Sequence, residues 1–81
     1  MIEKEITVTI EKGLHARPAA ELVKKLNGFQ SIVEFHVGGK TYNPKSVLSM
    51  MTASIGQGET IRVVINGSDE EEVIELLTKF L

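Results

Sequence analysis

The sequence contains no cysteine and no tryptophan, and its only aromatic residues are three phenylalanines and one tyrosine. The absence of cysteine excludes disulfides and thiolate metal sites, so the fold must depend on its apolar core. An RNA-binding module of the RRM type needs aromatic side chains on its sheet and a basic face. The shortage of aromatic residues and the formal net charge of −2 argue against such a module.

Long apolar runs are absent as well. Residues 1–5 are mostly charged and lack the apolar run of a signal peptide, and no stretch approaches the length of a membrane span. We therefore expect a cytoplasmic protein with neither a nucleic acid nor a membrane as its partner. With 81 residues, one domain over 1–81 is expected. So small a domain has little room for a deep cleft, so its chemistry should lie near the surface and depend on a partner protein.

Two patterns predict the first strand and the first helix. Ile6, Val8 and Ile10 alternate with polar residues, which is typical of a strand with one solvated face. Apolar residues at helical spacing then predict a helix over 16–27. Because a proline is tolerated only in the first turn of a helix, Pro18 places the start of this helix at about His15.

The middle of the chain predicts a hairpin and a short helix. Strands are expected over 32–37 and 40–42, joined by Gly38-Gly39, since paired glycines are typical of a two-residue hairpin turn. A short helix over 46–51 follows, with Ser46 in its N-cap position.

The last third of the sequence predicts a strand over 60–65 and a final helix. Ser68 and Glu71 match a capping box, which marks the start of a helix. The expected order is therefore β-α-β-β-α-β-α, an α+β domain with helices on one face of the sheet. The expected buried stripe of the last helix is Val73, Leu77 and Phe80, flanked by Ile74 and Leu81.

The segment over 13–20 carries the residues most typical of chemistry. His15 lies at the expected helix start, where backbone N–H groups have no partner and the helix dipole adds about half a positive charge. This location favours the neutral imidazole, which is a nucleophile, and it also favours a bound anion. If His15 accepts a phosphoryl group, the N–H groups of Ala16 and Arg17 and the Arg17 guanidinium can bind its oxygens.

These residues alone leave a plainer interpretation open, because short motifs often match by chance. His15 can be an ordinary N-cap residue and Arg17 a solvated charge. A self-contained enzyme is not expected, because no second catalytic group or acid–base pair accompanies His15. A metal site made from His15 and His36 is not expected either, since no third ligand lies nearby in the sequence.

Two motifs resemble a known family over essentially the whole chain. Residues 13–20, Gly-Leu-His-Ala-Arg-Pro-Ala-Ala, are similar to the active-site motif of HPr, the histidine-containing phosphocarrier of the bacterial phosphoenolpyruvate-dependent sugar phosphotransferase system. Residues 45–48 with Met51 are similar to the regulatory-serine segment of that family. The hairpin over 38–40 and the segment 67–70 also fall where the family has them.

The resemblance implies an HPr-like open-faced β-sandwich, with a four-stranded antiparallel sheet and three helices on one face. It implies that enzyme I, charged by phosphoenolpyruvate, phosphorylates His15 on Nδ1. His15 would then pass the group to IIA domains of sugar permeases, with Arg17 assisting at the phosphate. No metal or cofactor is implied, and a monomer is expected. A regulatory or nitrogen-system paralogue that uses the same phosphohistidine for signalling stays open as the alternative.

Ser46 has two interpretations. As an N-cap it stabilises a helix by about 1 kcal/mol. In HPr proteins of many Gram-positive bacteria, however, the matching serine is phosphorylated by an ATP-dependent kinase. By that resemblance Ser46 is a regulatory phosphorylation site, and a serine kinase/phosphorylase and a transcriptional regulator become further partners.

An apolar ring around His15 is expected to form the partner interface, since exposed apolar patches commonly mark such sites. Core packing is the alternative, and it is open for Leu14 and Val47 in particular. Lys24 and Lys45 are expected either to face an acidic partner or to be solvated charges. The expected interface consists of Leu14, Ala20, Lys24, Lys45, Val47, Leu48 and Met51.

Three positions depart from the pattern of the family. Lys12 stands where many relatives have serine, threonine or asparagine, which puts in doubt a side-chain contact from there to the ring or the phosphate. Leu48 replaces a common methionine or phenylalanine, and Ser49 replaces a common glycine or lysine. We expect these changes to bear mainly on the choice of partner.

Overall fold

Four strands and three helices follow one another in the predicted order. The computed structural model describes every residue from 1 to 81. The strands are β1 (Ile2–Thr7), β2 (Ile32–Val37), β3 (Lys40–Tyr42) and β4 (Thr60–Asn66), and the helices are α1 (Ala16–Leu26), α2 (Val47–Ala53) and α3 (Glu70–Phe80).

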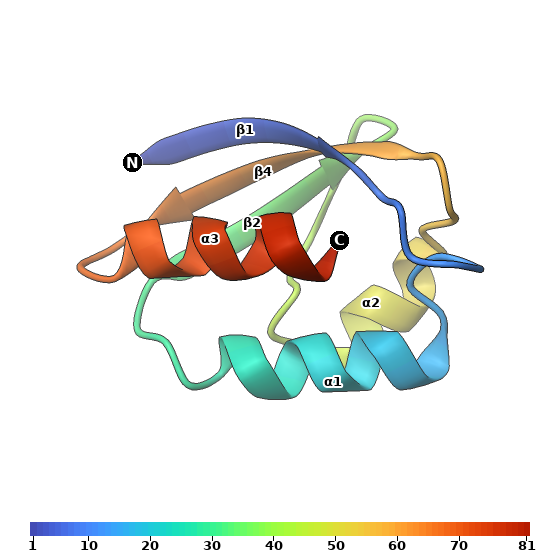
Figure 1. Ribbon diagram of the computed structural model, residues 1–81, viewed down its shortest axis with the longest axis horizontal. Helices are drawn as coiled ribbons and strands as arrows, with labels where there is room; N and C mark the ends of the chain where they lie inside the picture. Colours follow the sequence, from blue (N-terminus) through green and yellow to red (C-terminus); the bar gives the residue numbers. More distant parts are fainter.

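The strands form one antiparallel sheet in the order β1-β4-β2-β3. All three helices lie on the same side of this sheet, and its other side is open (Figure 1). The predicted α+β open-faced sandwich is therefore confirmed. This layering leaves the connections at the ends of the strands and helices free to carry the functional residues.

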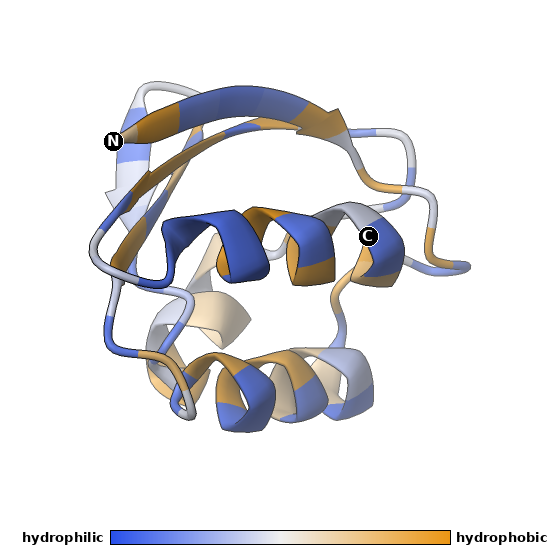
Figure 2. Ribbon diagram, turned by 60° about the vertical axis from the view of Figure 1, so that its left-hand side comes forward, coloured by the Kyte–Doolittle hydropathy of each residue, from blue (hydrophilic) through white to orange (hydrophobic).

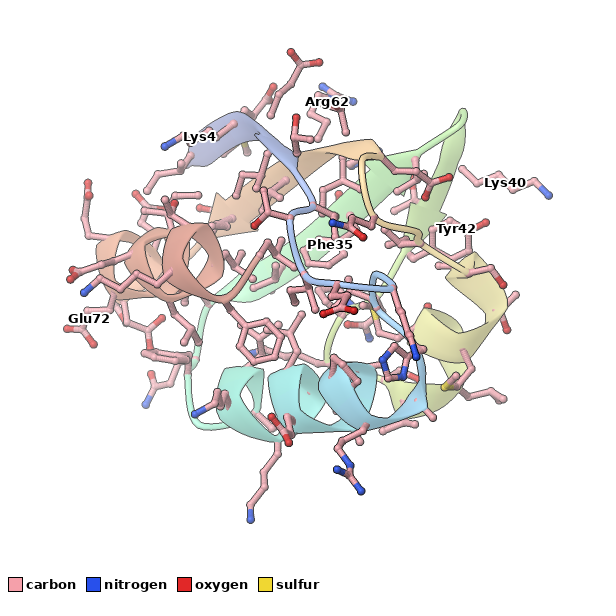
Figure 3. All side chains as sticks on the ribbon, turned by 45° about the vertical axis from the view of Figure 1, so that its right-hand side comes forward. Lys4, Phe35, Lys40, Tyr42, Arg62 and Glu72 are labelled. Atoms are coloured by element: carbon pink, nitrogen blue, oxygen red, sulfur yellow. The ribbon has the colours of Figure 1, made fainter.

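The core fills the space between the sheet and the helices. Along β4, Ile61, Val63 and Ile65 are fully buried while the residues between them are more exposed. Figure 3 shows Phe35 between the sheet and the helices and Arg62 on the open face. The apolar side of α1 faces the interior and its outer side is polar (Figure 2). Burial of alternate strand residues against apolar helix faces thus stabilises the two layers.

The predicted end of the first strand needs correction. The first strand ends at Thr7, where its pairing with β4 begins at Thr60, although Val8 remains buried beyond it. The chain therefore leaves the sheet earlier than the alternation up to Ile10 suggested. In α1, Leu22 belongs to the buried face.

The predicted capping box of the last helix is wrong. The N-cap of α3 is Asp69, and neither it nor Ser68 makes a side-chain capping bond. The Asp69 carboxylate instead accepts hydrogen bonds from the backbone N–H groups of Gln30 and Ser31, at 2.8 and 2.9 Å, and from the Ser31 hydroxyl. A tertiary contact with the loop between α1 and β2 therefore replaces the local one.

The buried stripe of α3 also differs in one residue from the prediction. Val73, Leu77 and Leu81 are buried, whereas Phe80 and Ile74 are only half-buried. Residues spaced by four lie on one face of a helix, so a stripe that starts at Val73 continues to Leu81 rather than to Phe80.

The Asp69 contact predicts a pH-dependent contribution to stability. Hydrogen bonds from the Ser31 hydroxyl and from backbone N–H groups lower the pKa of Asp69 below its usual value. A depressed pKa in the folded state means that this contribution is present above the unfolded pKa and is lost as the pH falls through the folded one. We expect Asp69→Ala to lower Tm by roughly 4–8 °C or more at pH 7. The difference from wild type should shrink as the pH falls below the usual range of an aspartate pKa, as measured by circular dichroism.

Ser68→Ala is the matched control, because Ser68 is exposed and makes no capping bond. Its Tm should stay close to that of wild type at every pH. A larger loss from Ser68→Ala than from Asp69→Ala would contradict the assignment.

Candidate functional site

The loop over residues 8–15 leads from β1 to α1, and Gly13 fixes its course. The φ angle of Gly13 is +71°, in the left-handed region. A Cβ atom here would lie 2.5 Å from the carbonyl oxygen of Ile55 and 2.7 Å from the backbone nitrogen of Gln57. The next N–H, that of Leu14, donates to the Ile55 carbonyl at 2.8 Å. The loop is therefore held against residues 55–57, and this contact sets the place of His15.

His15 is the N-cap of α1, as predicted. Its backbone is extended, and its carbonyl accepts the first helical hydrogen bond, from the Ala19 N–H at 2.9 Å. His15 is exposed, and its imidazole makes no capping hydrogen bond. Pro18 is the third helical residue and lies within the first turn.

The first turn of α1 suits an anion. The N–H groups of Ala16 and Arg17 have no helical acceptor, because only the residues after the first turn can bond back along the helix. No acidic side chain lies in this turn. The two N–H groups and the positive end of the helix dipole are thus available to bind an oxyanion close to His15.

Arg17 lies within this first turn and is exposed. None of the four ion pairs of the structure includes it, and its guanidinium makes no side-chain hydrogen bond within the protein. Lys24, two turns further along α1, is likewise exposed and without an ion pair. Both cations are free to meet an anionic group or partner.

A pocket of about 290 Å³ lies beside His15. No carboxylate lines it, and the exposed sulfur-bearing side chain of Met51 connects it to α2. A larger pocket of about 480 Å³ lies between β2, β3 and the start of α2, but it contains no histidine. The smaller pocket is the one that adjoins His15. Its lining residues are Lys12, Leu14, His15, Met51, Ser54, Ile55 and Gly56.

The apolar surface next to the site comes from α2 rather than from the loop before α1. Val47, Leu48 and Met51 are 44%, 78% and 39% exposed, respectively. Leu14 is only 2% exposed and belongs to the core. Its expected place in an exposed ring is therefore wrong, because its N–H is bonded to Ile55 and its side chain turns inward. Ala20 is exposed on α1.

Lys45 does not project freely, as an interface cation would. Its ammonium donates to the carbonyl of Phe29 at 2.9 Å, and the residue is half-buried. This hydrogen bond joins the turn after α1 to the start of α2. The expectation that Lys45 faces a partner is corrected to a role in holding these two segments together.

Ser46 is the N-cap of α2, as predicted. Its hydroxyl oxygen accepts a hydrogen bond from the Ser49 N–H at 3.2 Å. The Ser49 hydroxyl in turn accepts from the Asn43 N–H at 2.9 Å. Ser46 therefore has a definite structural role, which neither requires nor excludes a phosphate.

Sequence reasoning missed the segment over 54–56 as part of the site. The Gly56-Gln57-Gly58 turn is visible in the sequence, but nothing there shows that it packs against residues 12–14. Ser54 adopts a left-handed conformation with φ of +50°, which is uncommon for a residue with a side chain. This conformation ends α2 and turns the chain toward His15.

His36 lies on β2, on the open face of the sheet, and takes no part in this site. Its Nε2 is 3.1 Å from Glu34 Oε1, and its Nδ1 is 3.1 Å from the Thr41 hydroxyl. The structure has no cluster of three or more histidine or acidic residues placed to hold a metal ion. No helix has the length and apolar character that crossing a membrane requires.

Comparisons with known proteins agree with this geometry. The family model described as "PTS HPr component phosphorylation site" matches residues 2–81. The HPr-like protein Crh of Halalkalibacterium halodurans is 41% identical over 81 residues, which cover 100% of this chain and 96% of that protein. The crystal structure of phosphocarrier protein HPr from Bacillus anthracis str. Ames superposes with a TM-score of 0.94 at 38% identity, covering 99% of this chain and 95% of that one.

A second kind of relative is represented by the Bacillus subtilis catabolite repression protein Crh. Its crystal structure matches with a TM-score of 0.76 at 34% identity, covering 99% of this chain and 92% of that one. That structure is described as an intertwined dimer with a swapping domain.

Proposed function

The chain belongs to the PTS HPr family, and from this premise we propose that His15 accepts a phosphoryl group from phospho-enzyme I and transfers it to IIA domains of sugar permeases. The observation that carries the proposal is the exposed imidazole of His15 at the N-terminus of α1, beside two free N–H groups and an unpaired guanidinium. The family is one of phosphocarriers rather than catalytic enzymes, and we assign the remaining catalytic groups to the partners.

The proposed transfer is a displacement at phosphorus. The lone pair of His15 Nδ1 forms the new P–N bond, while the bond between phosphorus and the donor atom of phospho-enzyme I breaks and its electron pair returns to that atom. The proton on Nε2 takes no part. Since phosphoryl transfer requires mainly positioning and charge stabilisation, the Arg17 guanidinium and the N–H groups of Ala16 and Arg17 can supply this chain's share.

The expected strengths of the hydrogen bonds to the phosphoryl group suit a group that is held and then released. A hydrogen bond to a charged group contributes about 1.5–3 kcal/mol when sheltered, and less at an exposed site. Two N–H groups and one guanidinium at the surface hold a phosphoryl group in place without trapping it. An enclosed site with more donors would make the onward transfer less favourable.

The partner surface follows from the same geometry. The exposed apolar side chains of Val47, Leu48 and Met51 adjoin His15 through the pocket, and Arg17 and Lys24 lie on α1. Such a surface fits a partner with an apolar patch bordered by acidic groups. We propose that one surface serves enzyme I and the IIA domains in turn, in the cytoplasm, and that the carrier acts as a monomer. Size-exclusion chromatography with light scattering tests the last point.

The similarity to Crh, which is named for catabolite repression in Bacillus subtilis, supports a regulatory paralogue as a second candidate. In this candidate, His15 would carry a phosphoryl group for signalling. The two candidates differ in the acceptor and not in the chemistry of His15. Incubation of the phosphorylated protein with a panel of IIA domains separates them, because a sugar carrier loses its phosphoryl group to at least one of them.

The test of the proposed function is phosphorylation with labelled phosphoenolpyruvate, Mg²⁺ and a general enzyme I. We expect one phosphate per chain, labile in acid and stable in base, as a phosphohistidine is. Intact-mass spectrometry gives the stoichiometry, and peptide mapping gives the site. Failure with enzymes I from several bacteria would exclude the carrier role.

We also propose that phosphorylation of Ser46 weakens the reaction with enzyme I. A phosphate adds about −1.5 to −2 charges next to Val47 and Leu48, beside a surface that we expect to meet acidic groups. Ser46→Asp should lower the rate of phosphorylation by enzyme I roughly tenfold, which is ~1.4 kcal/mol in activation free energy.

Ser46→Asn is the matched neutral control, because asparagine is as good an N-cap as aspartate. It should react at the rate of wild type. Equal rates for Ser46→Asp and Ser46→Asn would refute the electrostatic effect.

A further inference from the structure

The pocket beside His15 contains one cation whose role the proposed function leaves unassigned. Lys12 lines this pocket together with His15 and the hydroxyl-bearing Ser54, whereas Arg17 does not line it. The Lys12 ammonium makes no ion pair and no side-chain hydrogen bond within the protein. The pocket lining therefore combines His15 with an unpaired lysine, and Arg17 is not part of it.

The backbone holds Lys12 in this place. Its φ angle is +66°, in the left-handed region that lysine rarely adopts, and Gly13 follows with φ of +71°. Its N–H donates to Gln57 Oε1 at 3.4 Å, and the N–H of Gly13 donates to the Ile10 carbonyl at 2.8 Å. A side chain on such a constrained turn starts from a defined position beside the pocket. Backbone conformations of this kind cluster at functional sites.

The residues around the pocket favour an anion. Its lining contains a lysine, a histidine and a serine, but no acidic residue. The Glu59 carboxylate accepts a hydrogen bond from the Gly56 N–H at 2.9 Å, so Gly56 has no free N–H to offer. The Ser54 hydroxyl donates to the Met51 carbonyl at 3.5 Å, which leaves Lys12 as the unpaired cation of the pocket lining.

We propose that Lys12 is a phosphate-binding residue of this carrier, an inference that rests on the proposed phosphorylation of His15. Its ammonium binds an oxygen of the phosphoryl group from the pocket side, while Arg17 and the N–H groups of α1 bind from the helix side. The second cation stabilises the phosphorylated form and favours the fully ionised phosphoryl group. This chain should therefore hold its phosphoryl group more tightly than it would with a neutral side chain at position 12.

The test follows the phosphoryl group itself by ³¹P NMR. Wild type, Lys12→Gln, Lys12→Arg and Lys40→Gln are phosphorylated chemically with phosphoramidate, so that the experiment does not depend on enzyme I. Lys40 is the matched control: it lies by the hairpin turn between β2 and β3 (Figure 3), and its replacement changes the net charge equally. None of the variants adds a β-branch to the left-handed position, so all should fold.

We expect Lys12→Gln to raise the apparent pKa of the phosphoryl group, because removal of a nearby cation disfavours its fully ionised form. Lys12→Arg should restore the wild-type value, and Lys40→Gln should not change it. The shift should weaken in 1 M salt, where exposed charges are screened. With enzyme I, the equilibrium constant for phosphorylation of Lys12→Gln should fall about three- to tenfold.

A titration of Lys12→Gln that matches wild type, or an equal shift in Lys40→Gln, would overturn the inference. These results are distinct from a failure of the proposed function. If enzyme I does not phosphorylate the wild type, a Lys12-dependent titration of the chemically phosphorylated protein still supports the phosphate contact. If enzyme I does phosphorylate the wild type, an unchanged phosphoryl titration in Lys12→Gln refutes the role of Lys12 and leaves the carrier function standing.

Discussion

Replacing His15 by alanine is expected to abolish phosphate uptake from phospho-enzyme I, by at least about a thousandfold. Among the residues that line the pocket, His15 carries the imidazole, a nucleophile whose attack at phosphorus yields an acid-labile phosphoramidate. His36 cannot take over, because it lies on β2 in hydrogen bonds with Glu34 and Thr41. The measurement is the initial rate of label transfer from phosphoenolpyruvate with enzyme I in excess.

Stability should hardly change in this variant, so lost activity cannot be ascribed to unfolding. The His15 side chain is exposed and makes no capping hydrogen bond, and surface substitutions of this kind stay within about 0.5 kcal/mol. His36→Ala is the control and should keep the full rate. Retention of one acid-labile phosphate per chain in His15→Ala would show that another residue is the acceptor.

The features that the sequence predicts well are those set by local chemistry. Pro18 restricts the start of α1 to within one turn, and this places His15 at the N-cap without knowledge of the rest of the fold. Alternation along β4 predicts which side chains are buried, because one face of the sheet is covered. Gly38-Gly39 predicts the hairpin, since both residues adopt positive φ angles.

The features that it predicts poorly depend on contacts between distant segments. Ser68 and Glu71 resemble a capping box in sequence, yet the N-cap is Asp69, whose carboxylate bonds to Ser31, 38 positions away. Lys45 resembles a free surface cation, yet it bonds to the Phe29 carbonyl. Ser54 reaches the site only because its segment packs against the loop before α1. No local pattern records such pairings, so the sequence locates His15 at the N-cap but not the pocket around it.

Replacing Gly13 by alanine is expected to have the largest effect on stability among substitutions at the site. A non-glycine residue in the left-handed region costs about 1–2 kcal/mol. The new Cβ would also lie 2.5 Å from the Ile55 carbonyl oxygen and 2.7 Å from the Gln57 nitrogen, which are backbone atoms that no rotamer change can move. Together these terms should reach about 3 kcal/mol or more, which lowers Tm by roughly 12–24 °C in a domain of this size.

Phosphoryl transfer should fall too, because the loop that must shift is the one that positions Lys12 and His15. A displacement of about 1 Å can reduce a rate a hundredfold. Gly39→Ala is the matched control: its φ of +80° is also left-handed, but no atom lies within 4 Å of the added Cβ. Gly39→Ala should lose only the stability that the left-handed conformation costs, and its rate of phosphoryl transfer should not change. Thermal unfolding and transfer rates, measured under conditions where both variants are folded, separate the conformational cost from the steric clash. Equal losses of stability in both variants would contradict the steric argument.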